Sequence, residues 1–401
     1  MQQDNARHGI GIDVGTDMVR VVIGVAKGDE KATIIGYGEA KNTGMRKGTI
    51  INIDRTAEAV DKALATAEKM GGYHVQSAAV STNGSHIGGL TSKGVIAVTG
   101  REVDGNDVRR AEEAATVVQL GENREILDLT PRSYALGDQD NIKDPIGMTG
   151  VRLEVDAFII TALTPHIRNL DKVLEMTELP KPKIILSGIA AARAVLTEQQ
   201  RENGVICVDI GGSTTNIAVY EEGELLHTAV LPVGSNNITN DLAIGLRTDL
   251  DIAEQVKIQY AVAIPTARRV GGHIKIKAEG QTHLFNTELV DEIVAARVEE
   301  IFELVNLELK KINRFAKLPG GVVITGGGAQ LSGIAEAAKE IMKLSARVGR
   351  PPKFDGMGDK LAVPAWSTAL GLMEIDLDQR LMLYANTKPK KAGFKLFGKN
   401  K

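Results

Sequence analysis

Two stretches of the chain share one pattern of apolar and polar positions. Residues 205–220 read VICVDIGGSTTNIAVY, and residues 11–24 read GIDVGTDMVRVVIG. In both, apolar residues alternate on each side of a break that holds an acid, glycine and small polar residues. Alternation with a period of two around a glycine break predicts a β-hairpin, and the repeat predicts two related halves. In a common frame the stretches match at three pairs: Asp13 with Asp209, Gly15 with Gly211, and Asp17 with Ser213.

The rest of the pattern predicts further helices and strands. An apolar stripe at helical spacing predicts a helix over 54–72, capped by Asp54 and ended by Gly71. Short strands around one charged helix predict a compact α+β insertion over 83–163. The other expected elements are a buried strand over 74–82, a helix–strand–helix run over 166–198, a polar helical stretch over 235–300, a strand–turn–helix over 321–334, and a long helix over about 288–316 with Leu289, Ile293, Ile301, Leu304 and Leu309 on its apolar side.

Composition narrows the class of protein. The 401 residues are enough for two or more domains, and 43% hydrophobic with 25% charged residues is ordinary for a soluble globular protein. A net charge of −3 and 3% aromatic residues give no reason to expect a nucleic-acid partner. Cys207 is the only cysteine, which excludes an intrachain disulfide and favours the reducing cytoplasm. No 18-residue apolar stretch predicts a membrane span.

The two breaks have the chemistry of a site for phosphate and a divalent cation. Glycine permits a tight turn, and successive backbone N–H groups there form an anion-binding concavity. The hydroxyls of Ser213, Thr214 and Thr215 can add donors, whereas Asp13 and Asp209 would repel a phosphate directly. These two acids fit a hydrated Mg²⁺ placed between them and the phosphates. The alternative is a pair of ordinary hairpins with Asx-type turns, which the second copy of the pattern disfavours.

A third glycine break lies in TGGGAQL, residues 325–331. It follows a predicted buried strand and opens a predicted helix. Gly326, Gly327 and Gly328 would let flat backbone lie against the adenine or ribose of a nucleotide. Taken alone, these residues are equally typical of a tight turn between a strand and a helix. Their position after the two hairpins favours the nucleotide.

The order of these motifs resembles the actin, heat-shock-chaperone and sugar-kinase superfamily, and within it the FtsA family of bacterial cell-division proteins. The segments that carry the resemblance are LSGIAAARAVLTEQQRENGVICVDIGGSTTNIAVYEEGEL, PIGMTGVRLEVDAFIITA, SNNITNDLA, DIAEQVKIQYA, AARVEEIFELV and VVITGGGAQLSGI. It covers about residues 8–385 and implies an α/β, actin-like two-lobed ATPase fold with duplicated sheet-and-helix domains and a small inserted α+β domain. The implied domains are a first lobe (1–82, 164–198 and about 360–387), the insertion (83–163), a second lobe (199–242 and 301–359), a subdomain of that lobe (243–300), and a linker with a basic amphipathic tail (388–401).

The resemblance also implies that ATP and Mg²⁺ bind between the lobes, with Asp13 and Asp209 holding the metal through water. Ser213 stands where the family usually has a third glycine, which adds a Cβ near the phosphates. Glu254 and Lys257 would face the adenosine, although without the resemblance they are a solvated i,i+3 ion pair. The implied nucleotide-binding residues are Asp13, Gly15, Thr16, Asp17, Asp209, Gly211, Gly212, Ser213, Thr214, Thr215, Asn216, Gly234, Asn237, Glu254, Lys257, Gly326, Gly327 and Gly328.

Hydrolysis of ATP needs a group that positions water in line with the γ-phosphate. Relatives in the superfamily carry a Gln or Glu near the connecting helix, and this chain has Ser187 near that position. We therefore expect ATP to be mainly a structural and switching ligand, with slow turnover at most.

The last residues, KPKKAGFKLFGKNK, combine lysines with apolar side chains. The family typically ends in a linker and an amphipathic helix that lies on the membrane. Each copy of the tail is expected to bind an anionic membrane weakly, and a polymer of many copies firmly. A solvated C-terminus is the alternative. The expected membrane-binding residues are Lys391, Phe394, Lys395, Leu396 and Phe397.

The resemblance implies a protein that polymerises at the cytoplasmic face of the cell membrane, at the division septum, and anchors the FtsZ ring. The C-terminal peptide of FtsZ would dock on about 243–300, where Arg297 would lie on the binding face; a solvated helix charge is the alternative. Later division proteins would bind the inserted domain. Two other functions stay open: a small-molecule kinase of the same superfamily, for which 83–163 offers no obvious catalytic aspartate, and a pilus-assembly adaptor like PilM, which the basic, aromatic tail disfavours.

Overall fold

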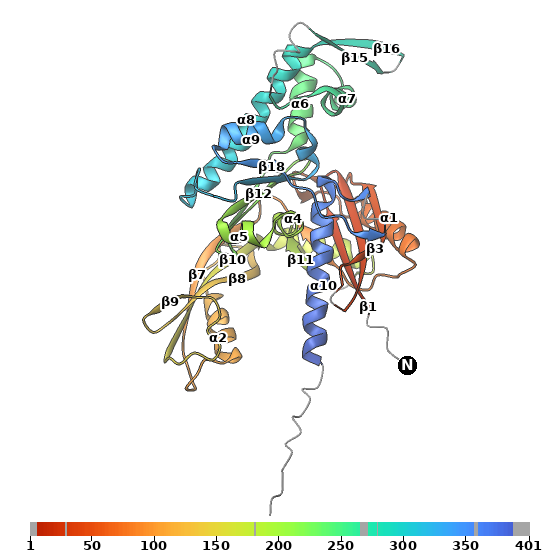
Figure 1. Ribbon diagram of the computed structural model, residues 1–401. Coiled ribbons are helices and arrows are strands. Elements are labelled where there is room, and N and C mark those ends of the chain that lie inside the picture. Colours follow the sequence, from red (N-terminus) through yellow and green to blue (C-terminus); the bar gives the residue numbers. More distant parts are fainter. Residues whose placement is uncertain are drawn as a thin grey trace, which may run out of the picture.

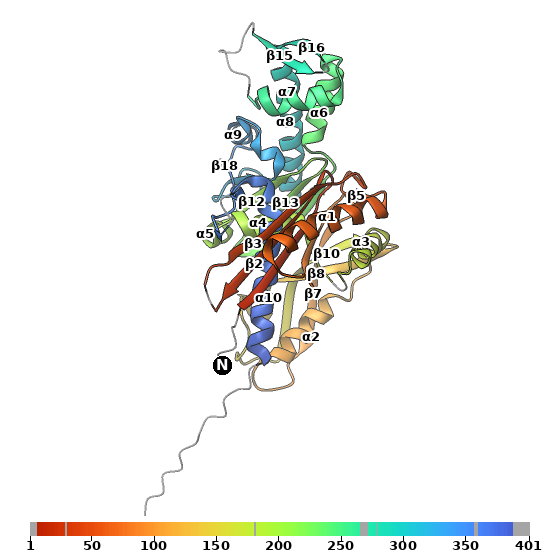
Figure 2. The ribbon, with the colours of Figure 1, turned by 90° about the vertical axis from the view of Figure 1, so that its right-hand side faces the viewer.

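The chain folds into two sheet-and-helix lobes with a small domain inserted in the first. A computed structural model describes residues 6–28, 30–179, 182–264, 272–278, 280–356 and 360–387. In Figure 1 the second lobe lies above, the first sheet at the lower right and the inserted domain at the lower left. The view from the side shows the first sheet in front of the long helix near the C-terminus (Figure 2). The prediction of two related halves with a small α+β insertion is confirmed.

The first sheet has the strand order β11-β6-β1-β2-β3-β19. β1, β2 and β3 form an antiparallel meander, and β6 and β11 continue the sheet in parallel beyond β1. Because successive side chains on a strand point to opposite faces, Ile10 and Ile12 pack under α1 while Gly9 and Gly11 lie against α10. The bounds are β1 Ala6–Val14, β2 Met18–Lys27, β3 Thr33–Lys41, β6 Ala79–Thr82, β11 Lys183–Leu186, β19 Asp355–Gly356, α1 Ile53–Gly71 and α10 Ser367–Thr387.

The second sheet repeats this plan, with the strand order β14-β13-β12-β17-β18. Here β12, β13 and β14 form the antiparallel meander, and β17 and β18 continue the sheet in parallel beyond β12. Both lobes therefore open with a hairpin whose turn lies beside the end of a parallel strand. The bounds are β12 Val205–Ile210, β13 Thr215–Glu221, β14 Glu224–Leu231, β17 Val322–Thr325 and β18 Ala346–Val348.

Two helices lie where the lobes meet. α4, over Ser187–Val195, packs along α10 and also against β12 and β13. Ala190, Ala191 and Ala192 of α4 are fully buried, and a Cβ built on Gly371 of α10 would overlap the Ala190 carbonyl, so the two helices approach closely. The remaining helices are α3 Thr164–Met176, α5 Glu198–Asn203, α6 Ser235–Leu246, α7 Leu250–Tyr260, α8 Thr287–Lys311 and α9 Ile334–Met342, with the short 3₁₀ helices η2 Gly327–Gln330 and η4 Pro364–Trp366.

The inserted domain is a four-stranded sheet, β7-β10-β8-β9, covered by one helix. Its inner end shares a hydrophobic core with the second lobe, since Phe158 and Ile160 pack with Tyr220 and Leu225. The strands are longer than the short strands expected here, with 13 residues in β8 and 12 in β10. The bounds are β7 Gly88–Ala97, α2 Gly105–Ala115, β8 Arg124–Leu136, β9 Gln139–Ile142 and β10 Arg152–Leu163.

Several sequence-based boundaries were wrong. Asn52, not Asp54, caps α1, because its side chain accepts the N–H of Arg55, and Gly72 follows the helix in a left-handed conformation. The strand expected over 74–82 is only β6. The polar helical stretch contains a hairpin formed by β15, His273–Ala278, and β16, Gln281–Asn286. Helix α8 ends at Lys311, and its expected apolar residue Leu289 is 40% exposed. A second small hairpin joins β4, Met45–Arg46, to β5, Thr49–Ile50.

Candidate functional site

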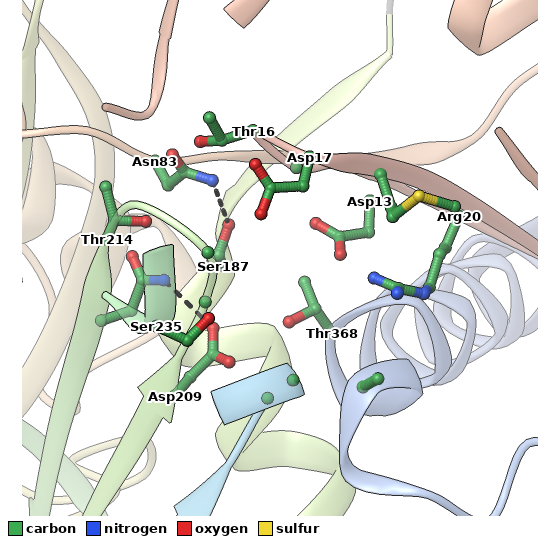
Figure 3. A pocket seen from close by; sticks show the side chains of 18 residues that line it. Asp13, Thr16, Asp17, Arg20, Asn83, Ser187, Asp209, Thr214, Ser235 and Thr368 are labelled. Carbon is green, nitrogen blue, oxygen red and sulfur yellow. Dashed lines mark hydrogen bonds between the residues drawn. The ribbon is translucent and has the colours of Figure 1, made fainter. Parts of the chain in front are cut away.

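A pocket lies where the two hairpin turns meet. Asp13 and Asp17 enter it from the first lobe and Asp209 from the second, so the acids face one another across it (Figure 3). The residues that line it are Asp13, Gly15, Thr16, Asp17, Met18, Arg20, Asn83, Ser187, Asp209, Gly211, Gly212, Thr214, Asn216, Ser235, Gly326, Gly327, Ala365 and Thr368.

The two hairpins place their polar residues in the same register. In the first, Asp13 pairs with Arg20 on the neighbouring strand, and in the second Asp209 pairs with Asn216. Each turn is closed by one backbone hydrogen bond. In the first turn the Gly15 N–H donates to the Met18 carbonyl at 3.2 Å, and in the second the Gly211 N–H donates to the Thr214 carbonyl at 2.8 Å. The shared register explains why both acids reach the pocket.

Each acid is held by a neighbouring polar side chain. The Ser81 hydroxyl donates to Asp13 Oδ1 at 2.8 Å and accepts the Val14 N–H at 2.8 Å. In the second lobe, Asn216 Nδ2 donates to Asp209 Oδ2 at 3.0 Å. The Oδ1 of Asn216 is buried and has no hydrogen-bond partner among the described residues. Both carboxylates are therefore fixed in orientation. The Asn216 Oδ1, beside Asp209, can still accept a hydrogen bond from a donor such as bound water.

Burial makes the charged forms of these acids costly. Burial, and to a lesser extent the like charge of Asp13, raise the pKa of Asp209 to about 7, against the hydrogen bond from Asn216. Burial also raises the pKa of Asp13, while Arg20 and the bond from Ser81 act in the opposite direction. Two buried carboxyls that face each other are a place where a divalent cation would relieve repulsion. The described residues hold no cluster of three or more His, Cys, Asp or Glu that could hold a metal ion.

The turns also present backbone donors. Within the described chain, the N–H groups of Thr16, Asp17, Gly212, Ser213 and Thr214 donate no hydrogen bond. Such unpaired N–H groups in successive residues form a concavity that binds anions. The φ of Ser213 is not positive, so the turn accepts a side chain where the family usually has glycine.

The structure brings together eleven of the residues expected at the nucleotide. They are Asp13, Gly15, Thr16, Asp17, Asp209, Gly211, Gly212, Thr214, Asn216, Gly326 and Gly327. Gly326, which follows β17 directly, has to be glycine. Its φ is +83°, and a Cβ there would overlap the Asp209 carboxylate.

The other seven lie in the described part of the chain but do not line the pocket. Ser213 accepts a hydrogen bond from Asn236 at 3.4 Å, Thr215 is buried and donates to the Val233 carbonyl at 2.8 Å, and Asn237 accepts the N–H of Gly234 at 3.1 Å. Glu254 and Lys257 form an ion pair of 2.7 Å on α7. Lys257, with a side chain 11% exposed, also donates to Thr239 on α6 at 2.8 Å, so the pair joins two helices. Gly328 packs against Ile210.

Sequence reasoning missed several residues that line the pocket. Arg20 lies over the Trp366 ring, with 5.6 Å between the guanidinium carbon and the ring centroid. Asn83 donates to the Ser187 hydroxyl over 3.5 Å, which places an amide beside the serine noted above (Figure 3). Thr368 comes from α10 and Ser235 from α6. The register of the first hairpin, which sets Arg20 opposite Asp13, could have predicted Arg20 at the pocket. Asn83, Ser235 and Thr368 come from distant segments that only the fold brings to the pocket.

Arg297 lies on α8 and faces α6. Its guanidinium donates twice to Asp241, at 2.6 and 3.0 Å, and also contacts Glu300. Its side chain is 20% exposed. The expected membrane-binding residues Lys391, Phe394, Lys395, Leu396 and Phe397 lie outside the described residues.

Comparison with known proteins identifies the family. Residues 206–371 match the profile of the family described as cell division protein FtsA, and residues 84–161 match the SHS2 domain inserted in FtsA. The chain is 38% identical over 366 residues to the cell division protein FtsA of Neisseria meningitidis, covering 90% of this chain and 88% of the relative. It is 35% identical over 391 residues to the FtsA of Bacillus subtilis, covering 96% and 86%. The chain belongs to the FtsA family.

Solved structures place this FtsA-family chain in the actin-like fold. The PilM–PilN type IV pilus biogenesis complex matches with a TM-score of 0.66 at 14% identity, covering 92% of this chain and 98% of that chain. MreB5 of Spiroplasma citri bound to ADP matches with a TM-score of 0.57 at 13% identity, covering 95% and 99%. At such identities the likeness shows the fold alone, and it confirms the actin-like prediction. Among the described helices of this FtsA-family chain, none has the length and apolarity to cross a membrane.

Proposed function

We propose that the chain binds ATP with Mg²⁺ between its lobes, polymerises at the cytoplasmic face of the cell membrane, and anchors the FtsZ ring at the division septum. Membership of a cell-division family supports the division role. The observation that carries the proposal is the meeting of two acid-and-glycine turns, one from each lobe, in one pocket. A protein that binds a ligand between two lobes can couple the ligand to the arrangement of the lobes, which is what a nucleotide-dependent polymer requires.

The pocket residues divide the binding of Mg·ATP among them. The unpaired N–H groups of the two turns would receive the phosphate oxygens, and Arg20 adds a positive charge from the first lobe. Asp13 and Asp209 would hold the metal through water, and the ion would neutralise part of the phosphate charge. Gly326 and Gly327 would lie beside the adenosine. The solved structures of MreB5 of Spiroplasma citri bound to ADP and to AMPPNP show that a protein of this fold holds such ligands.

Hydrolysis is proposed to be slow. Ser187 stands at the start of α4 and its hydroxyl donates to the Thr82 carbonyl at 3.1 Å. Because the Ser187 hydroxyl proton is donated to the Thr82 carbonyl, it is not available to a water molecule in the pocket. Asn83 is the neighbouring amide, but its Nδ2 points to Ser187. Neither Ser187 nor Asn83 carries a carboxylate that could activate water, and we propose that ATP acts mainly as a switching ligand.

Affinity for Mg·ATP should rise with pH between 6 and 8. Asp209 has a pKa of about 7, and only its ionised form attracts the cation. The ionised fraction grows about tenfold over these two pH units, so the association constant should grow by about the same factor. Titration calorimetry at several pH values measures this. The variant Asp209→Asn is the control, because it keeps the titration of the nucleotide itself; an equal pH dependence in the variant would assign the effect to the nucleotide alone.

Membership of the FtsA family and the composition of the C-terminal tail support the partner and membrane roles. The C-terminal peptide of FtsZ would dock on the subdomain over 243–300 and the adjoining Arg297 face, and later division proteins would bind the inserted domain. The two bonds from Arg297 to Asp241 support a rigid α6–α8 surface there. The tail at 388–401 carries six lysines with Phe394, Leu396 and Phe397, which favours an anionic membrane.

Deleting residues 388–401 should release the protein from anionic liposomes and leave FtsZ in the supernatant. The full chain should sediment with the liposomes and carry FtsZ with it, because the tail would supply lysine attraction and apolar insertion. Replacing Phe394 and Phe397 by serine keeps the charge and should lose most of the binding. Equal sedimentation with and without the tail would refute the anchor, and liposome-bound protein that leaves FtsZ behind would refute the FtsZ role.

The alternatives are less well supported. A small-molecule kinase would need a catalytic acid beside a second ligand, and the pocket acids of this chain face each other instead. The pilus complex with PilM shares the fold at 14% identity, whereas the relatives at 35% to 38% identity are cell-division proteins.

A further inference from the structure

We propose that Asp17 and Asn236 form a clasp between the two lobes, and that a phosphate must open this clasp to enter the pocket. The inference deepens the proposed function and rests on the nucleotide site described there. The Nδ2 of Asn236 lies 2.9 Å from both carboxylate oxygens of Asp17, which comes from a segment 219 residues away. A charge-assisted bond of this kind is stronger than one between neutral groups. Figure 3 shows the Asp17 side chain directed into the pocket.

The first half of the clasp is fixed to the first lobe. Asp17 belongs to the β1–β2 turn, and its carbonyl accepts the N–H of Asn42 at 2.8 Å. The side chain of Asn42 donates to the Gly15 carbonyl at 2.9 Å and accepts the Gly44 N–H at 2.9 Å. The loop after β3 therefore braces the turn, and the Asp17 carboxylate cannot shift without a change of its own rotamer.

The second half is fixed to the second lobe. Asn236 lies in the first turn of α6, and its backbone N–H donates to the Gly212 carbonyl at 2.7 Å. Its Nδ2 is also 3.4 Å from the Ser213 hydroxyl. Asn236 is thus bound to the turn that would receive the phosphates, so the clasp joins the two turns of the pocket through this one side chain.

The clasp and a phosphate compete for the same space. The Asp17 carboxylate packs on Gly212 so closely that a Cβ on this residue would overlap it. The N–H groups of Gly212 and Ser213 are the donors that a phosphate oxygen would use. A phosphate bound there would lie beside the Asp17 carboxylate, and two negative charges at such a distance repel strongly in a partly buried pocket. Phosphate entry therefore requires Asp17 to leave Asn236, which breaks the direct link between the lobes.

This competition makes Asp17 a determinant of affinity for the phosphate chain, and not for the nucleoside. Removing the carboxylate should tighten ADP and Mg·ATP by about tenfold, because no charged hydrogen bond has to be broken. Adenosine carries no phosphate, so its affinity should stay the same. Asp17→Asn removes the charge but retains an acceptor for Asn236, and it should give a smaller gain. Asn236→Ala frees Asp17 but keeps its charge, and it should also give a smaller gain.

Titration calorimetry of the full chain and the three variants with adenosine, ADP and Mg·ATP tests the clasp. The expected result is a gain for ADP and Mg·ATP in Asp17→Ala and an unchanged affinity for adenosine. Equal affinities of wild type and Asp17→Ala for Mg·ATP would overturn the clasp but keep the nucleotide site. Weaker binding of Mg·ATP by Asp17→Ala, in protein with native circular dichroism, would also overturn the clasp and would make Asp17 a ligand of the nucleotide. Absence of nucleotide binding in every form would reject the nucleotide site and the clasp together.

Discussion

Asp209→Ala is expected to weaken the binding of Mg·ATP by about 10-fold to 100-fold. Asp209 is one of two buried acids that face each other across the pocket, and it would hold the hydrated metal ion from the second lobe. Loss of a group that holds a metal through water typically costs 10-fold to 100-fold in affinity. The substitution also takes away the partner of Asn216, whose Nδ2 donates to this carboxylate at 3.0 Å. Titration calorimetry with Mg·ATP measures the effect.

The control for this prediction is Asp209→Asn. Its side chain has the same shape and can still accept from Asn216, but it carries no charge. Because burial makes the carboxylate costly at pH 8 and asparagine still accepts from Asn216, Asp209→Asn should unfold at the wild-type temperature or above it, as followed by circular dichroism. If Asp209→Asn keeps the wild-type unfolding temperature and binds Mg·ATP more weakly, the loss of affinity is due to the site and not to a damaged fold. Wild-type affinity in Asp209→Ala would remove the nucleotide site from the proposed function.

The parts of the fold that the sequence predicts are those with a local signal. Each hairpin is marked by alternation around an acid and glycine, and both hairpins are present. The β15–β16 hairpin has a similar signal in HIKIKA, where Ile274 and Ile276 are buried and the lysines alternate with them. This period of two covers only six residues, so the longer polar pattern around it predicts a helix there.

The parts of the site that the sequence does not predict come from distant segments. Asn83 follows β6 and Thr368 lies in α10, and neither has a motif around it. Their place in the pocket depends on how the sheet and α10 pack. Arg20 is different, because the hairpin register sets it opposite Asp13 once the turn is placed. Glu254 and Lys257 were expected at the adenosine from the resemblance. The structure places them in an ion pair on α7, outside the lining of the pocket, and Lys257 also donates to Thr239 on α6.

Gly371→Ala is expected to destabilise the protein by about 3 kcal/mol or more. Gly371 lies on α10 where this helix crosses α4, and an added Cβ would overlap the carbonyl oxygen of Ala190. The obstacle is backbone within a buried helix, so it cannot move aside as a flexible side chain would. Overpacking of this kind commonly costs about 1–3 kcal/mol and sometimes more. The midpoint of thermal unfolding should fall by roughly 4 °C or more.

A matched glycine on another helix separates this contact from the general effect of alanine. Gly105 begins α2, and a Cβ built on it meets nothing within 4 Å. Gly105→Ala should leave the unfolding temperature unchanged or raise it slightly, since alanine restricts the unfolded chain more than glycine does. Because α4 also packs against β12 and β13, the Gly371 variant should disturb the joint between the lobes. An unfolding temperature of Gly371→Ala equal to that of Gly105→Ala would show that α10 and α4 do not approach as closely as described.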